Sequence, residues 1–107
     1  MRIGGRYGKA LSLMKKGKAE GAFQIASGAL EEVRQLGTSD PLAVPLRVSV
    51  TVLFAQLAVQ LGRATEARHA AEETLKVYTE MESKVAAHEP LRREIEKLEY
   101  YARRQKE

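Results

Sequence analysis

The sequence predicts an all-α fold of about five helices. Ala, Leu, Glu, Lys and Arg dominate its 107 residues, with only three Pro and no Trp, which is a helix-forming composition. Two stretches, residues 16–33 and 61–78, place small and apolar residues at the same offsets after a glycine. A chain of this length is expected to form a single domain over residues 1–107.

The first helix is expected over residues 6–16 and to end at Gly17. Its apolar residues repeat at i, i+4 and i+7, which is a helical stripe: Tyr7, Leu11 and Met14. The preceding residues 1–5 are expected to be loose, because their two adjacent glycines carry high backbone entropy.

The second helix is expected over residues 19–36, with one apolar face made of Ala22, Phe23, Ala26, Leu30 and Val33. A break follows at residues 37–41. Gly37 is expected to end the helix there, and Ser39 or Asp40 to cap the next one.

The third segment, residues 42–61, carries two conflicting patterns. Residues 47–52 alternate polar and apolar side chains, which is typical of a strand. Three leucines, however, lie at i, i+4 and i+8, and a lone strand would have no partner. We therefore favour a helix, with Pro45 in its first turns or at a kink.

The last two helices are expected over residues 65–86 and 90–105. The first of them should bury Ala67, Ala71, Leu75, Tyr78 and Val85. The second has a stripe of Leu91, Ile95, Leu98 and Ala102 opposite a charged face, on which residues 94/97 and 99/103 are expected to form ion pairs. Such a one-sided helix is expected to cover the second hairpin.

The two hairpins resemble the tetratricopeptide repeat, a helix–turn–helix unit with small residues at defined places. The matching residues are Gly17, Ala19, Ala22, Ala26 and Ala29-Leu30 in the first hairpin, and Gly62, Ala64, Glu66-Ala67, Ala71 and Leu75 in the second. The repeats would span residues 4–36 and 42–84, with a capping helix at 90–105. Their period is 45 residues, against about 34 in a regular array.

The resemblance implies a non-catalytic protein-interaction module or scaffold that binds a peptide or helix of a partner protein. In such repeats the first helix of each hairpin lines a concave groove, which assigns a partner-binding role to Tyr7, Leu11, Met14, Lys15, Ser49, Val52, Gln56 and Gln60. The alternative is that Tyr7, Leu11 and Val52 belong to the core. Because two repeats are fewer than an array needs, a second copy of the chain could complete the fold as a homodimer.

The charge distribution supports an alternative function. Residues 1–18 contain no acid but six basic residues, namely Arg2, Arg6, Lys9, Lys15, Lys16 and Lys18. A basic cluster of this kind can favour nucleic acid or acidic protein surfaces, as in a small nucleic-acid-associated or regulatory protein. The alternative, which we favour, is a solvated face with a flexible tail.

Reactive groups are scarce, so we expect no enzyme activity, no cofactor and no metal. The chain has no cysteine, and its two histidines lie in different segments. Glu66 and His69 have the i, i+3 spacing of some metal sites, but the further ligands are missing. We expect an exposed His69 paired with Glu66 or Glu73. The pair Tyr100-Tyr101, beside Arg103-Arg104, could stack on bases. We favour instead that Tyr101 packs near Leu98 while Tyr100 lies at the surface.

The sequence predicts neither a signal peptide nor a membrane span. The most apolar stretch, residues 42–61, contains Pro45, Arg47 and two glutamines, and is therefore interpreted as a buried helix. The absence of cysteine is in keeping with a reducing compartment, so a cytoplasmic location is expected.

Overall fold

The computed structural model describes residues 2–35, 43–81 and 89–103, and within these ranges the chain forms five α-helices and no strand. The all-α fold is thus confirmed. The helices are α1 (Arg2–Lys15), α2 (Ala19–Gln35), α3 (Val44–Gln60), α4 (Ala64–Met81) and α5 (Glu89–Arg103).

The helix boundaries differ from the expectation mainly at the N-terminus. Helix α1 begins at Arg2, so the expectation that residues 1–5 are loose is wrong for residues 2–5. A glycine destabilises a helix by only about 1 kcal/mol relative to alanine. A helix that is already nucleated and continues for several turns can extend over such residues. The expected caps at Gly37, Ser39 and Asp40, and the burial of Val85, fall on residues outside the described ranges.

The third segment is a helix, and the strand alternative is wrong. Eleven of the 17 residues of α3 are buried, and Pro45 lies in its first turn as expected. Two of the polar residues that suggested a strand, Arg47 and Thr51, are buried as well. The alternation misled because this helix is surrounded on most sides, so its polar residues need not mark a solvent-facing side.

The turns that follow α1 and α3 have the same backbone geometry. Gly17 and Gly62 both have a φ of 77°. The amide after each glycine donates to the carbonyl five residues earlier, Lys18 to Leu13 at 2.9 Å and Arg63 to Ala58 at 2.7 Å. The glycine amide itself donates to the carbonyl three residues earlier. This is the Schellman arrangement, in which a left-handed residue satisfies the last carbonyls of a helix.

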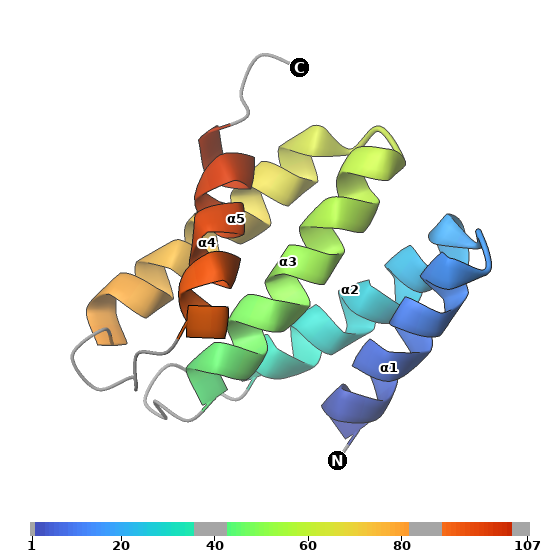
Figure 1. The fold of residues 1–107 in the computed structure, drawn as a ribbon, viewed down its shortest axis with the longest axis horizontal. Helices are drawn as coiled ribbons and strands as arrows, with labels where there is room; N and C mark the ends of the chain where they lie inside the picture. Colours follow the sequence, from blue (N-terminus) through green and yellow to red (C-terminus); the bar gives the residue numbers. More distant parts are fainter. Residues whose placement is uncertain (1, 36–42, 82–88, 104–107) are drawn as a thin grey trace.

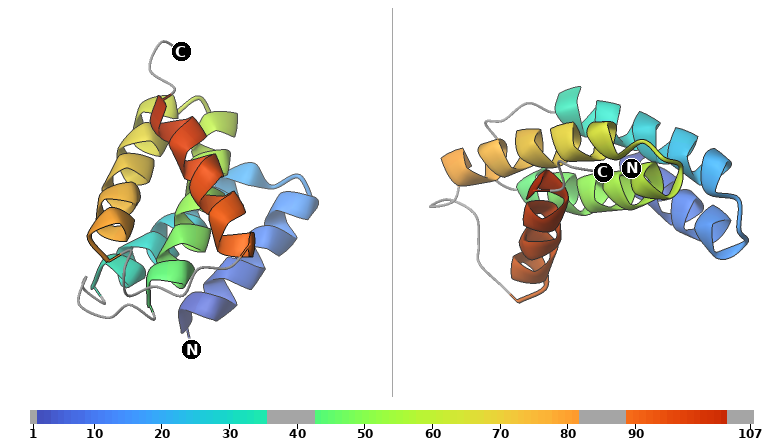
Figure 2. Two further views of the ribbon diagram at one scale, coloured as in Figure 1. Left: turned by 60° about the vertical axis from the view of Figure 1, so that its left-hand side comes forward. Right: turned by 90° about the horizontal axis from the view of Figure 1, so that it is seen from above.

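The helices run alternately up and down and form two layers (Figures 1 and 2). Seen from above, α2 and α4 lie on one side of the molecule, and α1, α3 and α5 lie on the other. Each helix packs against the next along the chain, and α5 also packs against α3. Helix α3 is therefore central, and it contacts α2, α4 and α5 extensively.

The larger of two core clusters joins α1, α2, α3 and the start of α4. At its centre the rings of Phe23 and Phe54 are stacked with centroids 5.1 Å apart. The guanidinium carbon of Arg63, from the turn before α4, lies 4.9 Å from the centroid of the Phe23 ring. A cation in this position is attracted to the ring face, so the second turn is held onto α2.

The second core cluster lies under α5. Leu91 and Leu98 of α5 are buried against the first turns of α3 and against Ala71 and Val77 of α4. Helix α5 therefore packs onto the second hairpin, as its apolar stripe predicts. Tyr101 is half-buried and packs against both clusters, so this side chain bridges the two parts of the core.

In the ranges that the structure describes, no helix combines the length and the apolar character that crossing a bilayer requires.

Candidate functional site

The candidate groove residues of α1 do not share one environment. Leu11 and Met14 are half-buried and pack against the larger core cluster, whereas Lys15 is exposed. Tyr7 belongs to α1, but its side chain lies outside the described part of the structure. The two apolar residues thus serve the core at least in part.

On α3, three of the four candidate groove residues lie at the surface. Ser49 and Gln56 are half-buried and Gln60 is exposed, while Val52 is only 4% exposed and belongs to the second core cluster. Because most of α3 is buried, these three polar residues form a narrow strip along it. A partner that touches α3 from this side has to do so through that strip.

A surface depression lies where this strip meets α5. It has a volume of about 550 Å³ and is lined by Gln56 of α3 together with Arg93, Glu96, Lys97, Tyr100 and Tyr101 of α5. Of the candidate groove residues whose side chains the structure describes, only Gln56 lines this depression. One predicted partner-binding residue, Gln56, thus lines a depression together with α5, a helix that was expected only to cap the fold.

Two tyrosines form one end of the depression. Their rings are arranged edge to face, with centroids 5.3 Å apart. Tyr100 is 57% exposed and is the only exposed large hydrophobic side chain among the residues described. Tyr101 is half-buried, so the expected placement of both tyrosines is confirmed. Aromatic side chains anchored beside a core in this way are typical of interaction hot spots.

Charged groups form the rest of the α5 wall. The Nζ of Lys97 lies 3.1 Å from a carboxylate oxygen of Glu94, one of the two ion pairs expected on this helix. The other expected pair, 99/103, does not form in the described ranges. The lining residues of α5 have the spacing i, i+3, i+4, i+7 and i+8. This spacing is visible in the sequence and could have shown that they share one face.

A second surface feature is a group of basic residues on α1 and the turn that follows it. Lys9, Lys15, Lys16 and Lys18 are all exposed. Among the residues that the structure describes, none of these four ammonium groups pairs with a carboxylate. The side chains of Arg2 and Arg6 lie outside the described part. The four lysines therefore make an uncompensated positive surface.

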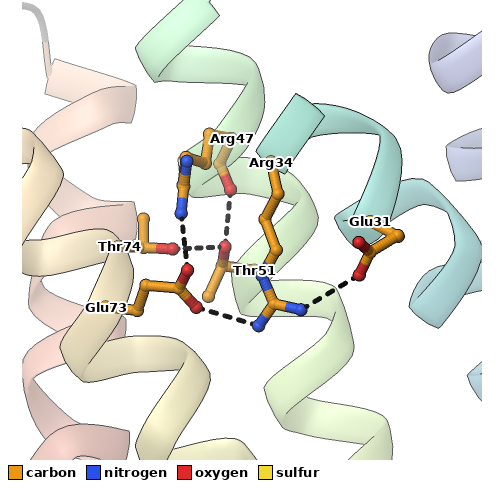
Figure 3. A network of polar contacts seen from close by, with 6 residues as sticks. All are labelled: Glu31, Arg34, Arg47, Thr51, Glu73 and Thr74. Carbon is orange, nitrogen blue, oxygen red and sulfur yellow. Dashed lines mark hydrogen bonds and ion pairs between the residues drawn. The ribbon is translucent and has the colours of Figure 1, made fainter. Parts of the chain in front are cut away.

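A polar network that the sequence analysis did not anticipate joins α2, α3 and α4 (Figure 3). One carboxylate oxygen of Glu73 accepts a hydrogen bond from Arg34 at 2.8 Å, and the other accepts one from Arg47 at 3.2 Å. Arg34 also pairs with Glu31 at 3.3 Å. Because these contacts tie side chains of three helices together, we assign the network a structural role.

Neither a metal site nor the expected histidine ion pair forms in the described ranges. No group of three potential metal-ligating His, Cys, Asp or Glu residues comes together there. His69 is exposed as expected, but its expected pairing is wrong. A carboxylate oxygen of Glu66 lies 3.8 Å from a guanidinium nitrogen of Arg63. The carboxylate of Glu73 forms ion pairs with Arg34 and Arg47. The carboxylates expected to pair with His69 are thus already engaged by arginines.

The chain matches no protein-family model, no curated protein and no solved structure. The proposals that follow therefore rest on the residues and contacts of this chain alone.

Proposed function

We propose that this protein is a non-catalytic interaction module and that the depression between α3 and α5 binds a segment of a partner protein. The observation that carries the proposal is the position of Tyr100, a 57% exposed aromatic ring at the end of a depression. Exposing the apolar surface of such a ring to water is unfavourable, and a partner that covered the ring would gain the free energy of burying that surface.

The neighbours of Tyr100 support the same function. Tyr101 holds the ring from one side and is itself anchored in both core clusters. A rigid aromatic loses little side-chain freedom on binding, so its contacts translate efficiently into affinity. Gln56 adds a neutral hydrogen-bonding group from the opposite wall. The resemblance to tetratricopeptide hairpins points in the same direction.

Selection from a displayed library of random peptides tests this proposal with the purified chain. We expect selected peptides to lose at least about tenfold in affinity against Tyr100→Ala, and several-fold against Gln56→Ala. Gln24→Ala, the same change at an exposed position of α2, should have no effect. The proposal is wrong if no peptide is selected or if the peptides bind all three variants equally.

A second copy of the chain is one partner that this surface could accept. Light scattering of the purified protein tests this case, because a homodimer closed through the depression should revert to a monomer on Tyr100→Ala. A dimer that Tyr100→Ala leaves intact would place the contact between copies elsewhere.

The four exposed lysines of α1 and its following turn favour a second candidate function, the binding of a nucleic-acid backbone. If all four lysines neutralise phosphates of duplex DNA, the binding constant should fall as salt is added. A plot of its logarithm against the logarithm of the salt concentration should have a slope of about −3.6. The double variant Lys15→Glu/Lys16→Glu should abolish binding, whereas Lys76→Glu on α4 should leave it nearly unchanged. Salt-independent binding, or none, would eliminate this candidate.

A further inference from the structure

We propose, on the basis of the second candidate function above, that a single phosphodiester strand lies lengthwise on the outer face of α1. Two small residues, Gly8 and Ser12, form the floor of this surface, and the exposed lysines beside and beyond them bind the phosphates. On this assignment the protein recognises the charge and shape of a nucleic-acid backbone and is indifferent to the base sequence.

Helix α1 presents an open face because it lies at the edge of the molecule (Figure 1). It packs extensively only against α2. On the side toward the core, Ala10 is buried and Leu13 and Met14 are half-buried against the larger core cluster. The outer face consists of the exposed residues Gly8, Lys9, Ser12, Lys15 and Lys16. These residues include no large apolar side chain.

The residues of the outer face are arranged in two neighbouring rows along the helix. Gly8, Ser12 and Lys15 lie at i, i+4 and i+7, which places them one above another. Lys9 and Lys16, at i and i+7, form the adjacent row. The two small residues are therefore bordered by lysines, with one lysine at the end of their own row and two in the row beside it.

The small residues of the floor let a ligand come close to the helix. A Cβ atom at Gly8 would meet nothing within 4 Å, and Ser12 is exposed one turn further along. A longer side chain at either place would keep a bound strand further from the helix. Because the attraction between two charges falls with their distance, a strand in contact with the floor gains most from the lysines around it.

The positive charge of this surface is not cancelled by neighbouring acids. Residues 1–19 contain no acid. The first acid of the chain, Glu20, has a carboxylate oxygen 3.9 Å from a guanidinium nitrogen of Arg63. Within the described ranges, the four ammonium groups on α1 and in the turn after it pair with no carboxylate. The face therefore favours a partner that brings several negative charges.

A phosphodiester strand fits this face better than an anionic bilayer or an acidic protein. A helix that binds in a bilayer interface inserts apolar side chains, and protein partners dock on aromatic or apolar anchors. The described residues of the outer face provide neither. A nucleic-acid backbone carries a regular row of charges and requires only cations and close approach. Lysines that bind phosphates carry no information about the bases, so the binding is expected to be independent of sequence.

Side-chain size at the floor tests the inference, because it can be changed without altering a charge. Gly8→Gln and Ser12→Gln should each weaken binding of a labelled DNA duplex at least about tenfold in fluorescence anisotropy. Gly8→Ala adds one methyl group and should leave the affinity within about twofold. Thr79→Gln, at an exposed position of α4, is the matched control and should change nothing. Since Gln is a better helix former than Gly or Ser, thermal unfolding should show that each variant remains folded.

A second set of probes tests which chemistry the surface recognises. Two duplexes of equal length and unrelated sequence should bind with affinities within about twofold of each other. A single strand should bind as well, because one backbone is sufficient, with a salt slope of about −2.8 if four lysines take part. Polyglutamate and vesicles that contain phosphatidylserine should bind at least about tenfold more weakly.

The outcomes separate this inference from the candidate function on which it rests. If Lys15→Glu/Lys16→Glu abolishes DNA binding but glutamine at either floor position does not weaken it, nucleic-acid binding stands and the position of the strand is wrong. A strong preference for one base sequence contradicts the inference in the same way. If neither duplex nor single strand binds, both proposals are wrong. Tighter binding of the vesicles or of polyglutamate also contradicts both, because the lysines then serve another anion.

Discussion

The guanidinium group of Arg47 lies 3.2 Å from the carboxylate of Glu73, and the two side chains differ greatly in exposure, at 6% and 45%. Arg47 is cationic and almost fully buried, and its Nε atom has no hydrogen-bond partner among the described residues. Glu73 therefore provides the charge that neutralises an arginine held near the start of the central helix. Its second oxygen binds Arg34 at 2.8 Å, so one carboxylate ties α2, α3 and α4 together.

We expect Glu73→Gln to lower the free energy of unfolding by about 2 kcal/mol. Removing one partner of a fully buried pair costs about 3–5 kcal/mol, and the exposure of Glu73 together with the remaining amide oxygen reduces this loss. Urea denaturation followed by circular dichroism measures it. Glu72→Gln is the matched control, because Glu72 only pairs with Arg68 at 3.8 Å on the surface. It should change stability by less than about 0.5 kcal/mol, and equal effects would contradict the structural role of Glu73.

The buried hydroxyl pair of Thr51 and Thr74 predicts an asymmetry between two similar substitutions. Thr51 donates to the carbonyl of Arg47 at 2.7 Å, and the two hydroxyl oxygens are 2.8 Å apart. A hydroxyl has one proton, and the carbonyl can only accept, so Thr74 is the donor between the two threonines. Thr51→Val therefore removes an acceptor and leaves the Thr74 hydroxyl unpaired, whereas Thr74→Val leaves the bond of Thr51 to the carbonyl intact.

We expect Thr51→Val to cost about 1.5 kcal/mol and Thr74→Val about 0.5 kcal/mol. The double variant should cost less than the sum of the two, because it leaves no unpaired hydroxyl in the core. Thermal or urea unfolding of the three variants gives the complete cycle. Additive effects, or a larger effect at Thr74, would show that the donor assignment is wrong.

Local sequence signals were sufficient for the helices but not for every boundary. The 3.6-residue period and the turn glycines are properties of neighbouring residues, and they predicted the course of the chain around Gly17 and Gly62. The start of α1 was missed because the argument from glycine entropy in residues 2–5 ignores the helix that continues beyond them. The polar residues Arg47 and Thr51 imitated a strand because their partners, Glu73 and Thr74, come from another helix.

The candidate site depends more strongly on tertiary structure. The strip along α3, which includes Gln56 and Gln60, was predictable because the polar residues share a helical face. The burial of Val52 was not, because it depends on the side of α3 that α5 covers. For the same reason the sequence did not join Gln56 to Tyr100, since the angle at which α5 crosses α3 leaves no periodic signal in either helix.

Glycine-to-alanine substitutions should have opposite effects on stability at the two turns and within α1. We expect Gly17→Ala and Gly62→Ala each to lower the free energy of unfolding by about 1 kcal/mol, because their φ of 77° is strained for a residue with a Cβ atom. Gly8 lies within α1, and a Cβ atom there would meet nothing within 4 Å. Gly8→Ala should therefore raise stability by about 0.5–1 kcal/mol. A loss at Gly8, or no loss at the two turns, would contradict the backbone geometry.

The packing of α5 predicts that the wall of the candidate site unfolds together with the rest of the domain. Leu98 of α5 and Leu57 of α3 are both fully buried, so each change to Ala should cost about 3 kcal/mol through lost burial and a new cavity. Tyr100→Ala, which alters the same helix on its exposed side, should cost less than about 0.5 kcal/mol. Urea denaturation should show a single transition in all three variants. If α5 were only loosely attached, Leu98→Ala would leave the midpoint of the main transition unchanged. It would reduce only the helical circular-dichroism signal at urea concentrations below that transition.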